Sequence, residues 1–159
     1  SSTMTVFSGQ NLGAGNYRRL CRSAWLIPLS AGAITLSAGI LVTIFCNPLL
    51  ALFTHDTAVL AFATRYIHIV LPFTWMYAIM NVIMCFANGI GEIKYPTIVN
   101  LFILWGVRIP VAYLLSRLGY GGYAMASVPL SFLAGMILML FYFRTKRWAK
   151  LCALAKNEP

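Results

Sequence analysis

The sequence predicts an all-α, polytopic membrane protein, a bundle of four complete transmembrane helices preceded by the end of a fifth. Three observations predict this class. Hydrophobic residues make up 60% of the 159 residues and charged residues only 9%, whereas about a quarter of an ordinary soluble domain is charged. The apolar residues form long uncharged runs, each close to the roughly 20 residues that a helix needs to cross a bilayer. Most of the twelve Lys and Arg residues lie at the edges of these runs.

The expected helices follow from the runs and from the residues that interrupt them. Residues 1–11 are expected to end a helix, because the glycines of Asn11-Leu-Gly-Ala-Gly15 permit the positive φ of a helix-ending turn. Asn47-Pro48 is expected to end the first span, Asp56 to cap the second, and Pro96 to lie in the first turn of the third. The complete spans are expected at about 23–45, 58–87, 96–115 and 123–143. Because the chain begins in a segment that already has helical character, we expect it to be a fragment of a longer protein.

The distribution of positive charge orients the spans. Eight Lys and Arg residues lie after the first helix fragment (18–22), between the second and third spans (94), and directly after the fourth span (144–150). The alternating loops contain only Arg117, together with Asp56 and His55. Since cytoplasmic loops carry the excess of Lys and Arg, we expect an inner-membrane protein whose C-terminus is cytoplasmic. The bundle would occupy residues 1–143 and a basic cytoplasmic tail residues 144–159, with Tyr142 and Trp148 at the interface.

This pattern explains the net charge of +9 as topology and contact with anionic lipid headgroups, so nucleic acid is not an expected partner. Small residues on the first and fourth spans are expected to form helix-packing faces. These residues are Ser30, Gly32, Ser37, Gly39, Ser127, Ser131 and Gly135.

Polar residues of the second span fall on one side of the expected helix. At about 100° per residue, Thr74, Tyr77, Asn81 and Asn88 lie within about 60° of one another. Inside a membrane such a stripe faces other helices or a water-filled cavity. Tyr77 and Asn81 lie nearer the middle of the membrane, which favours a cavity, whereas Thr74 and Asn88 suit hydrogen bonding between packed helices equally well.

The third span contains an arginine within its apolar run. Thr97, Leu104 and Arg108 lie within about 40° on a regular helix, and Asn100 lies within about 80° of Arg108. An arginine at that depth costs about 2.5 kcal/mol or more on insertion scales, so Arg108 needs water, a partner or a route to the interface. Either it serves a functional site, or it binds the carbonyls that Pro110 frees by kinking the helix.

Few residues suggest other chemistry. His68 can titrate near neutral pH and relay protons, or it can be a packed, hydrogen-bonded histidine. The four cysteines show no CxxC motif and no spacing with His55 or His68 that suits a metal. With no HExxH, no GxSxG and no carboxylate pair, the chain is not expected to be an enzyme or to bind a cofactor.

Several segments together resemble the multidrug and toxic compound extrusion (MATE) transporters. They are SGQNLGAGNYRR at 8–19, NPLLALFTHD at 47–56, NGIGEIKYP at 88–96, LWGVRIPVAYLL at 104–115 and YFRTKRW at 142–148. Their order and spacing run through nearly the whole chain and resemble the end of the eighth helix followed by helices nine to twelve.

The resemblance implies one part of a twelve-helix protein of two lobes around a central cleft, which exports organic cations or other xenobiotics in exchange for Na⁺ or H⁺. Many relatives place a carboxylate in the tenth helix, at a position that matches the neighbourhood of Tyr77. Because this chain has no Asp or Glu inside an expected span, the coupling-ion site would lie in the missing N-terminal half. The residues expected to line or brace the cleft are His68, Trp75, Tyr77, Asn81, Asn100 and Arg108. The alternatives are a related flippase for lipid-linked precursors and a membrane scaffold that does not transport.

Overall fold

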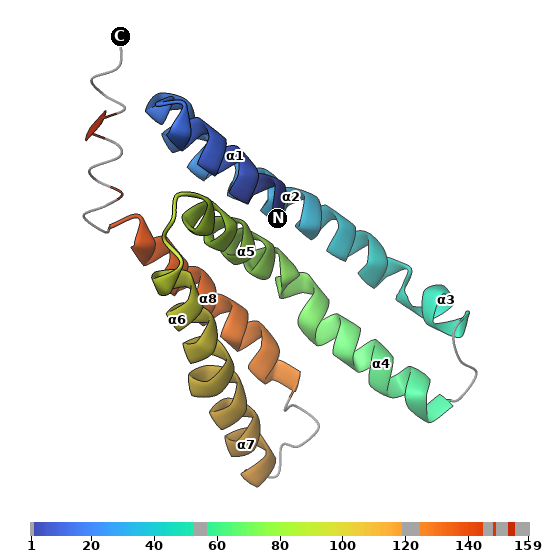
Figure 1. Cartoon of the computed structure of the whole chain (residues 1–159). Coiled ribbons are helices and arrows are strands. Elements are labelled where there is room, and N and C mark those ends of the chain that lie inside the picture. Colours follow the sequence, from blue (N-terminus) through green and yellow to red (C-terminus); the bar gives the residue numbers. More distant parts are fainter. Residues whose placement is uncertain (1, 53–56, 119–124, 145–147, 149–152, 155–159) are drawn as a thin grey trace.

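The computed structural model describes residues 2–52, 57–118, 125–144, 148 and 153–154. All its regular elements in this part of the chain are helices (Figure 1). Three helical stretches, Tyr17–Ile44, Thr57–Gly89 and Lys94–Arg117, are long and apolar enough to cross a membrane. The apolar helix at Ser127–Tyr142 is shorter. The predicted class, an all-α membrane helix bundle, is confirmed.

The first two helices are joined by the glycine turn. Helix α1 covers Ser2–Gly13 and α2 covers Tyr17–Ile44, and Gly15 between them has a φ of 75°, which L side chains adopt only at a cost. Helix α2 begins six residues before the predicted span, because arginine is a good helix former and the helix continues past the edge of the apolar run.

The end of α2 differs from the prediction by a few residues. The break falls at Phe45, and the short helix α3 (Cys46–Ala51) follows. Pro48 is therefore the third residue of α3, a first-turn position where a helix needs no backbone N–H group. Asp56, the predicted cap of the second span, lies outside the described residues.

The second predicted span is interrupted. It consists of α4 (Thr57–Val70), a 3₁₀ turn η1 (Leu71–Phe73) and α5 (Thr74–Gly89). Pro72 explains the interruption, because proline donates no backbone hydrogen bond and its ring crowds the carbonyl four residues earlier. The Thr74 hydroxyl donates to the Leu71 carbonyl at 2.7 Å and so satisfies one acceptor of this turn.

The third span contains a π-helix. After the turn at Gly91, with a φ of 83°, α6 covers Lys94–Phe102, the π-helix η2 covers Ile103–Arg108, and α7 covers Ile109–Arg117. The Ile109 N–H donates to the Leu104 carbonyl, five residues back, and Pro110 follows directly. Pro96 lies in the first turn of α6, as predicted. The last helix, α8, covers Ser127–Tyr142.

Helix α5 lies at the centre of the bundle, between α1 and α2 on one side and α6 and α8 on the other (Figure 1). One apolar cluster joins α1, α2, α5 and the end of α8 through residues that include Met4, Leu20, Phe86 and Tyr142. A second joins α5, α6, η2 and α8 through Met80, Ile83, Val99, Ile103 and Met139.

Small residues allow close helix contacts, although only part of the predicted set does so. Gly32 and Gly39 of α2 are buried against α5 and η1. Ser30 and Ser37, by contrast, are exposed and donate to carbonyls of their own helix, so they do not belong to that packing face. The predicted face of α8 is buried as expected, at Ser127, Ser131 and Gly135.

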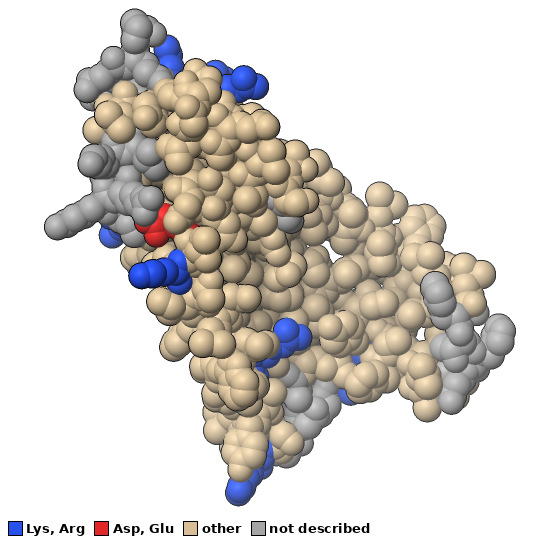
Figure 2. All heavy atoms as spheres, viewed as in Figure 1, with Lys and Arg blue, Asp and Glu red and all other residues tan. Residues whose placement is uncertain are grey.

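The remaining helix surface is mostly apolar, and charge collects at the helix ends. Figure 2 shows blue groups over the α1–α2 end and at the tip of α7, with tan covering most of the face between them. Tyr142 is 1% exposed and Trp148 7% exposed, and the Trp148 ring packs edge-on against Phe86 and Phe143. Both side chains therefore pack within this end of the bundle; their predicted position at the interface stays a prediction.

Candidate functional site

Two of the predicted site residues meet on α5. The Asn81 side chain donates to the Tyr77 hydroxyl at 3.1 Å, and the Cys85 thiol donates to the Asn81 amide oxygen at 3.6 Å. The Tyr77 ring also contacts the Phe132 ring of α8, with centroids 5.0 Å apart. We call Tyr77, Asn81 and Cys85 the polar ladder of α5.

Tyr77 and Asn81 lie outside the two apolar clusters of α5, whereas Cys85 packs against the cluster shared with α1 and α2. Met80 and Ile83 point into the cluster shared with α6 and α8, and Phe86 and Ala87 point into the cluster shared with α1 and α2. Tyr77 remains 43% exposed and Asn81 is half-buried. The amide and phenol groups are therefore available to water, to a ligand or to another part of the protein.

The other polar residues of this stripe behave differently. Thr74 uses its hydroxyl within the 3₁₀ turn, and Asn88 is exposed near the end of α5. Trp75 is half-buried and, two residues before Tyr77, projects from nearly the opposite side of α5. Trp75 thus lies apart from the polar ladder.

The predicted residues of the third span lie on other surfaces. Asn100 is exposed on α6, while Val99 and Ile103 make that segment's contacts with α5 and α8. The stripes of the two spans therefore do not converge, because α5 and α6 meet through apolar side chains. In addition, the predicted angle between Asn100 and Arg108 applies to a regular α-helix. A π-helix, which has more residues per turn, lies between the two residues, so that angle does not hold.

Arg108 ends the π-helix and is half-buried. Within the described residues, its guanidinium makes no hydrogen bond or ion pair, including none to the carbonyls near Pro110. The described spans offer no carboxylate to it, since Glu92 lies at the turn between α5 and α6 and the other two acidic residues, Asp56 and Glu158, lie outside the described part.

His68 lies near the end of α4, away from the polar ladder. Its Nδ1 donates to the Thr64 carbonyl at 2.8 Å, and the side chain is exposed. The ring is thus hydrogen-bonded within its own helix but not packed in the core.

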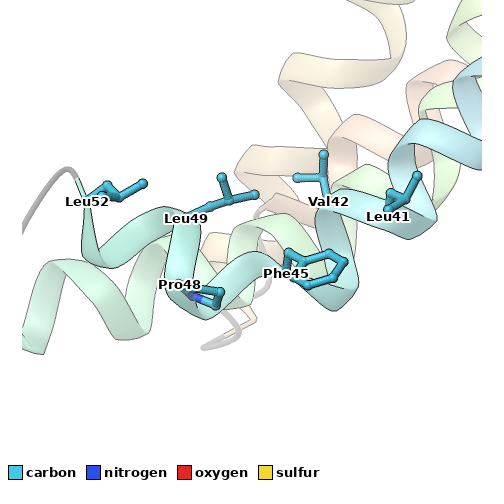
Figure 3. A pocket seen from close by; sticks show the side chains of 6 residues that line it. All are labelled: Leu41, Val42, Phe45, Pro48, Leu49 and Leu52. Carbon is cyan, nitrogen blue, oxygen red and sulfur yellow. The ribbon is translucent and has the colours of Figure 1, made fainter.

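Two hollows in the described part of the chain lie away from the polar ladder. One of about 390 Å³ lies at the α2–α3 bend and is lined by apolar side chains, among them Leu41, Phe45 and Leu52 (Figure 3). A second of about 410 Å³ lies beside η1 and α8 and is lined by apolar residues such as Phe73, Met76 and Leu133. Neither offers the polar groups that orient a small ligand. In the described part, no group of three His, Cys, Asp or Glu side chains could hold a metal ion.

Most of the chain matches one protein family. The model of the MatE family matches residues 1–114, a stretch that includes α1 to α6, the π-helix and the polar ladder. The chain belongs to the MatE family.

Curated MatE relatives cover nearly the whole chain. Probable multidrug resistance protein YoeA of Bacillus subtilis is 27% identical over 149 residues, which are 89% of this chain and 31% of that protein. Probable multidrug resistance protein NorM of Thermotoga maritima is 24% identical over 165 residues, covering 99% of this chain and 34% of that protein. The chain therefore spans about a third of the length of these relatives. No solved structure matches it.

Sequence reasoning missed three features of the site, of which two had a signal in the sequence and one had none. Pro72 inside an apolar run is a general signal for a helix interruption. Cys85 lies four residues after Asn81, the spacing at which helical side chains meet. The contact between Tyr77 and Phe132 depends on how α5 and α8 pack, and a single sequence carries no signal for it.

Proposed function

We propose that this chain forms part of a secondary active multidrug antiporter, driven by a Na⁺ or H⁺ gradient, in the inner membrane with a cytoplasmic C-terminus. Membership of the MatE family supports transport, and the names of two relatives support multidrug substrates. The observation that carries the proposal for this chain is the polar ladder, an accessible polar surface on the most central helix of the bundle.

In this proposal the polar ladder forms part of the wall of a cleft completed by the rest of the transporter. Asn81 offers an amide to polar groups of a substrate or its water shell, and the Tyr77 and Phe132 rings offer an aromatic surface to apolar cations. The described spans contain no carboxylate, so the rest of the transporter would supply the charge that binds the coupling ion.

Arg108 would brace the cleft from the third span. An unpaired guanidinium in an apolar helix needs a hydrogen-bond acceptor. We place that acceptor in the rest of the transporter. The π-helix supports this role, because such segments are frequent at functional sites.

Efflux of a fluorescent organic cation from cells that produce the complete transporter tests the proposal. Asn81→Leu and Arg108→Leu should each lower the efflux rate about tenfold or more while the protein still reaches the membrane, since each removes a polar group from the cleft. Ser37→Leu is the matched control, because Ser37 is an exposed residue of α2 whose hydroxyl bonds its own helix.

Removal of the ion gradients distinguishes efflux driven by an ion gradient from efflux that needs none. Efflux by an antiporter should stop when both the Na⁺ and the H⁺ gradients are removed. Unchanged efflux in the Asn81 and Arg108 variants would show that the polar ladder and Arg108 are not part of the cleft, and efflux without a gradient would exclude an antiporter.

A further inference from the structure

The strongest charged feature outside the polar ladder lies at the start of α2. Asn16, Arg18, Arg19 and Arg22 line a hollow of about 410 Å³, and Figure 2 shows blue groups at this α1–α2 end of the bundle. All three arginines are exposed. No Asp or Glu precedes Asp56 in the sequence, so the charged residues of α1 and α2 are all positive.

The hollow has the groups that bind a phosphate. Guanidinium groups bind phosphate oxygens in a bidentate manner. Within the described residues, Arg22 makes no hydrogen bond or ion pair, while Arg19 lies over the Phe7 ring of α1 at 5.4 Å from its centroid. Asn16, the residue before α2, makes no side-chain cap hydrogen bond, and uncapped N–H groups of a first helical turn attract anions.

An apolar strip continues directly from two of these arginines toward the membrane interior. Arg18, Arg22, Trp25 and Leu29 are spaced four, three and four residues apart, which places them on one side of α2. Trp25 is 54% exposed and Leu29 68% exposed. The Trp25 ring is held by stacking on Phe143, with centroids 4.5 Å apart, and tryptophan is enriched at the interface of a bilayer.

We propose that this surface binds one anionic phospholipid from the leaflet at the α1–α2 end. The phosphate lies among Arg18, Arg19 and Arg22, and the glycerol and upper acyl chain lie along Trp25 and Leu29. In such a lipid an apolar chain follows the phosphate group, and in α2 the apolar strip follows the arginines in the same order. A free phosphate ion would use the arginines alone.

Quenching of Trp25 fluorescence by bromine-labelled lipids tests the site. The purified chain is reconstituted into bilayers that contain bromine-labelled phosphatidylglycerol or bromine-labelled phosphatidylcholine, and Trp25→Phe supplies the background of the other tryptophans. At Trp25, phosphatidylglycerol should bind about tenfold more strongly than phosphatidylcholine, because each arginine near an anionic headgroup adds to the affinity.

Arginine variants test which residues cause the preference for phosphatidylglycerol. Arg22→Gln should lower the preference for phosphatidylglycerol several-fold, and the triple variant R18Q/R19Q/R22Q should abolish it. Arg117→Gln is the matched control, because Arg117 is also an exposed arginine at a span end but lies at the end of α7, and it should leave the preference unchanged. Circular dichroism shows whether each variant keeps its helices, and R18K/R19K/R22K, which keeps the charge, should retain most of the preference.

Any of three results would overturn the proposal. The first is an equal preference in the parent and in Arg22→Gln, and the second is an equal loss in Arg22→Gln and Arg117→Gln. The third is displacement of the labelled lipid when inorganic phosphate replaces chloride at constant ionic strength, because the arginines would then bind free phosphate and not a lipid.

Discussion

At the scale of single residues, the hydroxyl groups on the lipid-facing surfaces are satisfied by their own helices. Thr35, Ser37, Thr43 and Thr97 each donate to a carbonyl four residues earlier, at 2.7 to 2.8 Å. A membrane interior offers no water to unpaired polar groups, so these residues tolerate apolar surroundings without a partner helix. An amide or a guanidinium has too many donors for this solution, which is why Asn81 and Arg108 stand out.

Other hydroxyl groups form bonds between helices instead, as the Thr5 hydroxyl of α1 does with the Cys85 carbonyl of α5 at 3.1 Å. The Tyr95 hydroxyl of α6 donates to the Leu138 carbonyl of α8 at 2.7 Å. Tyr95→Phe should lower the free energy of unfolding in detergent by about 1 kcal/mol, because the hydrogen bond is lost while the ring remains. Titration with a denaturing detergent, followed by circular dichroism, measures the change.

Tyr113→Phe is the control for this prediction. The Tyr113 hydroxyl accepts a hydrogen bond from Arg117 at 2.9 Å on the exposed side of α7, and such exposed pairs contribute about 0.5 kcal/mol or less. An equal effect of the two substitutions would show that the bond between α6 and α8 adds nothing to stability.

At the scale of helices, glycine sets how closely α2 approaches α5. A Cβ atom at Gly32 would lie 2.8 Å from the Ile79 Cγ1 atom of α5, and one at Gly39 would lie 3.3 Å from the Leu71 carbonyl oxygen of η1. Gly39 therefore lets α2 pass the carbonyls of the 3₁₀ turn that Pro72 creates. Packing of this kind, and not a hydrophobic force, holds helices together in a lipid environment.

Gly32→Leu should therefore separate α2 from α5. We expect the free energy of unfolding to fall by about 1–3 kcal/mol, the usual cost of an overpacked contact, measured by the same detergent titration. Ala33→Leu, one residue further along α2 on an exposed surface, should change it by less than about 0.5 kcal/mol. Similar values for the two variants would contradict the close contact at Gly32.

At the scale of the whole molecule, the basic segments gather at one end. The turn between α1 and α2, the turn between α5 and α6, and the end of α8 lie at the same end of the bundle (Figure 1). These are the segments that contain Arg18, Arg19, Arg22, Lys94 and Arg144. The tertiary arrangement thus agrees with the proposed orientation, in which this end faces the cytoplasm.

Cysteine labelling checks the orientation. In a cysteine-free variant, Asn16→Cys and Lys94→Cys should react with a membrane-impermeant maleimide only after the cells are permeabilised. Ser116→Cys, at the opposite end, should react in intact cells. Ile40→Cys, which is exposed on the apolar surface of α2, should remain unlabelled in both conditions, and the reverse pattern for Asn16 and Ser116 would invert the orientation.

The sequence by itself determined the class of the protein, because long apolar runs bounded by arginine and lysine are stable only as helices in a bilayer. It also determined the glycine turn at Gly15 and the first-turn position of Pro96, since these depend on local backbone geometry. The common side of Tyr77 and Asn81 followed from helical periodicity alone.

Only the tertiary structure decided which polar residues are brought together. It kept Asn100 apart from the polar ladder of α5 and buried Trp148 within the bundle. It also introduced the π-helix before Pro110, which changes the direction of Arg108 relative to a regular helix. The physical reason is that in lipid all sides of an apolar helix are nearly equivalent in hydropathy, so packing against neighbouring helices, which a single sequence does not reveal, sets the rotation of each one.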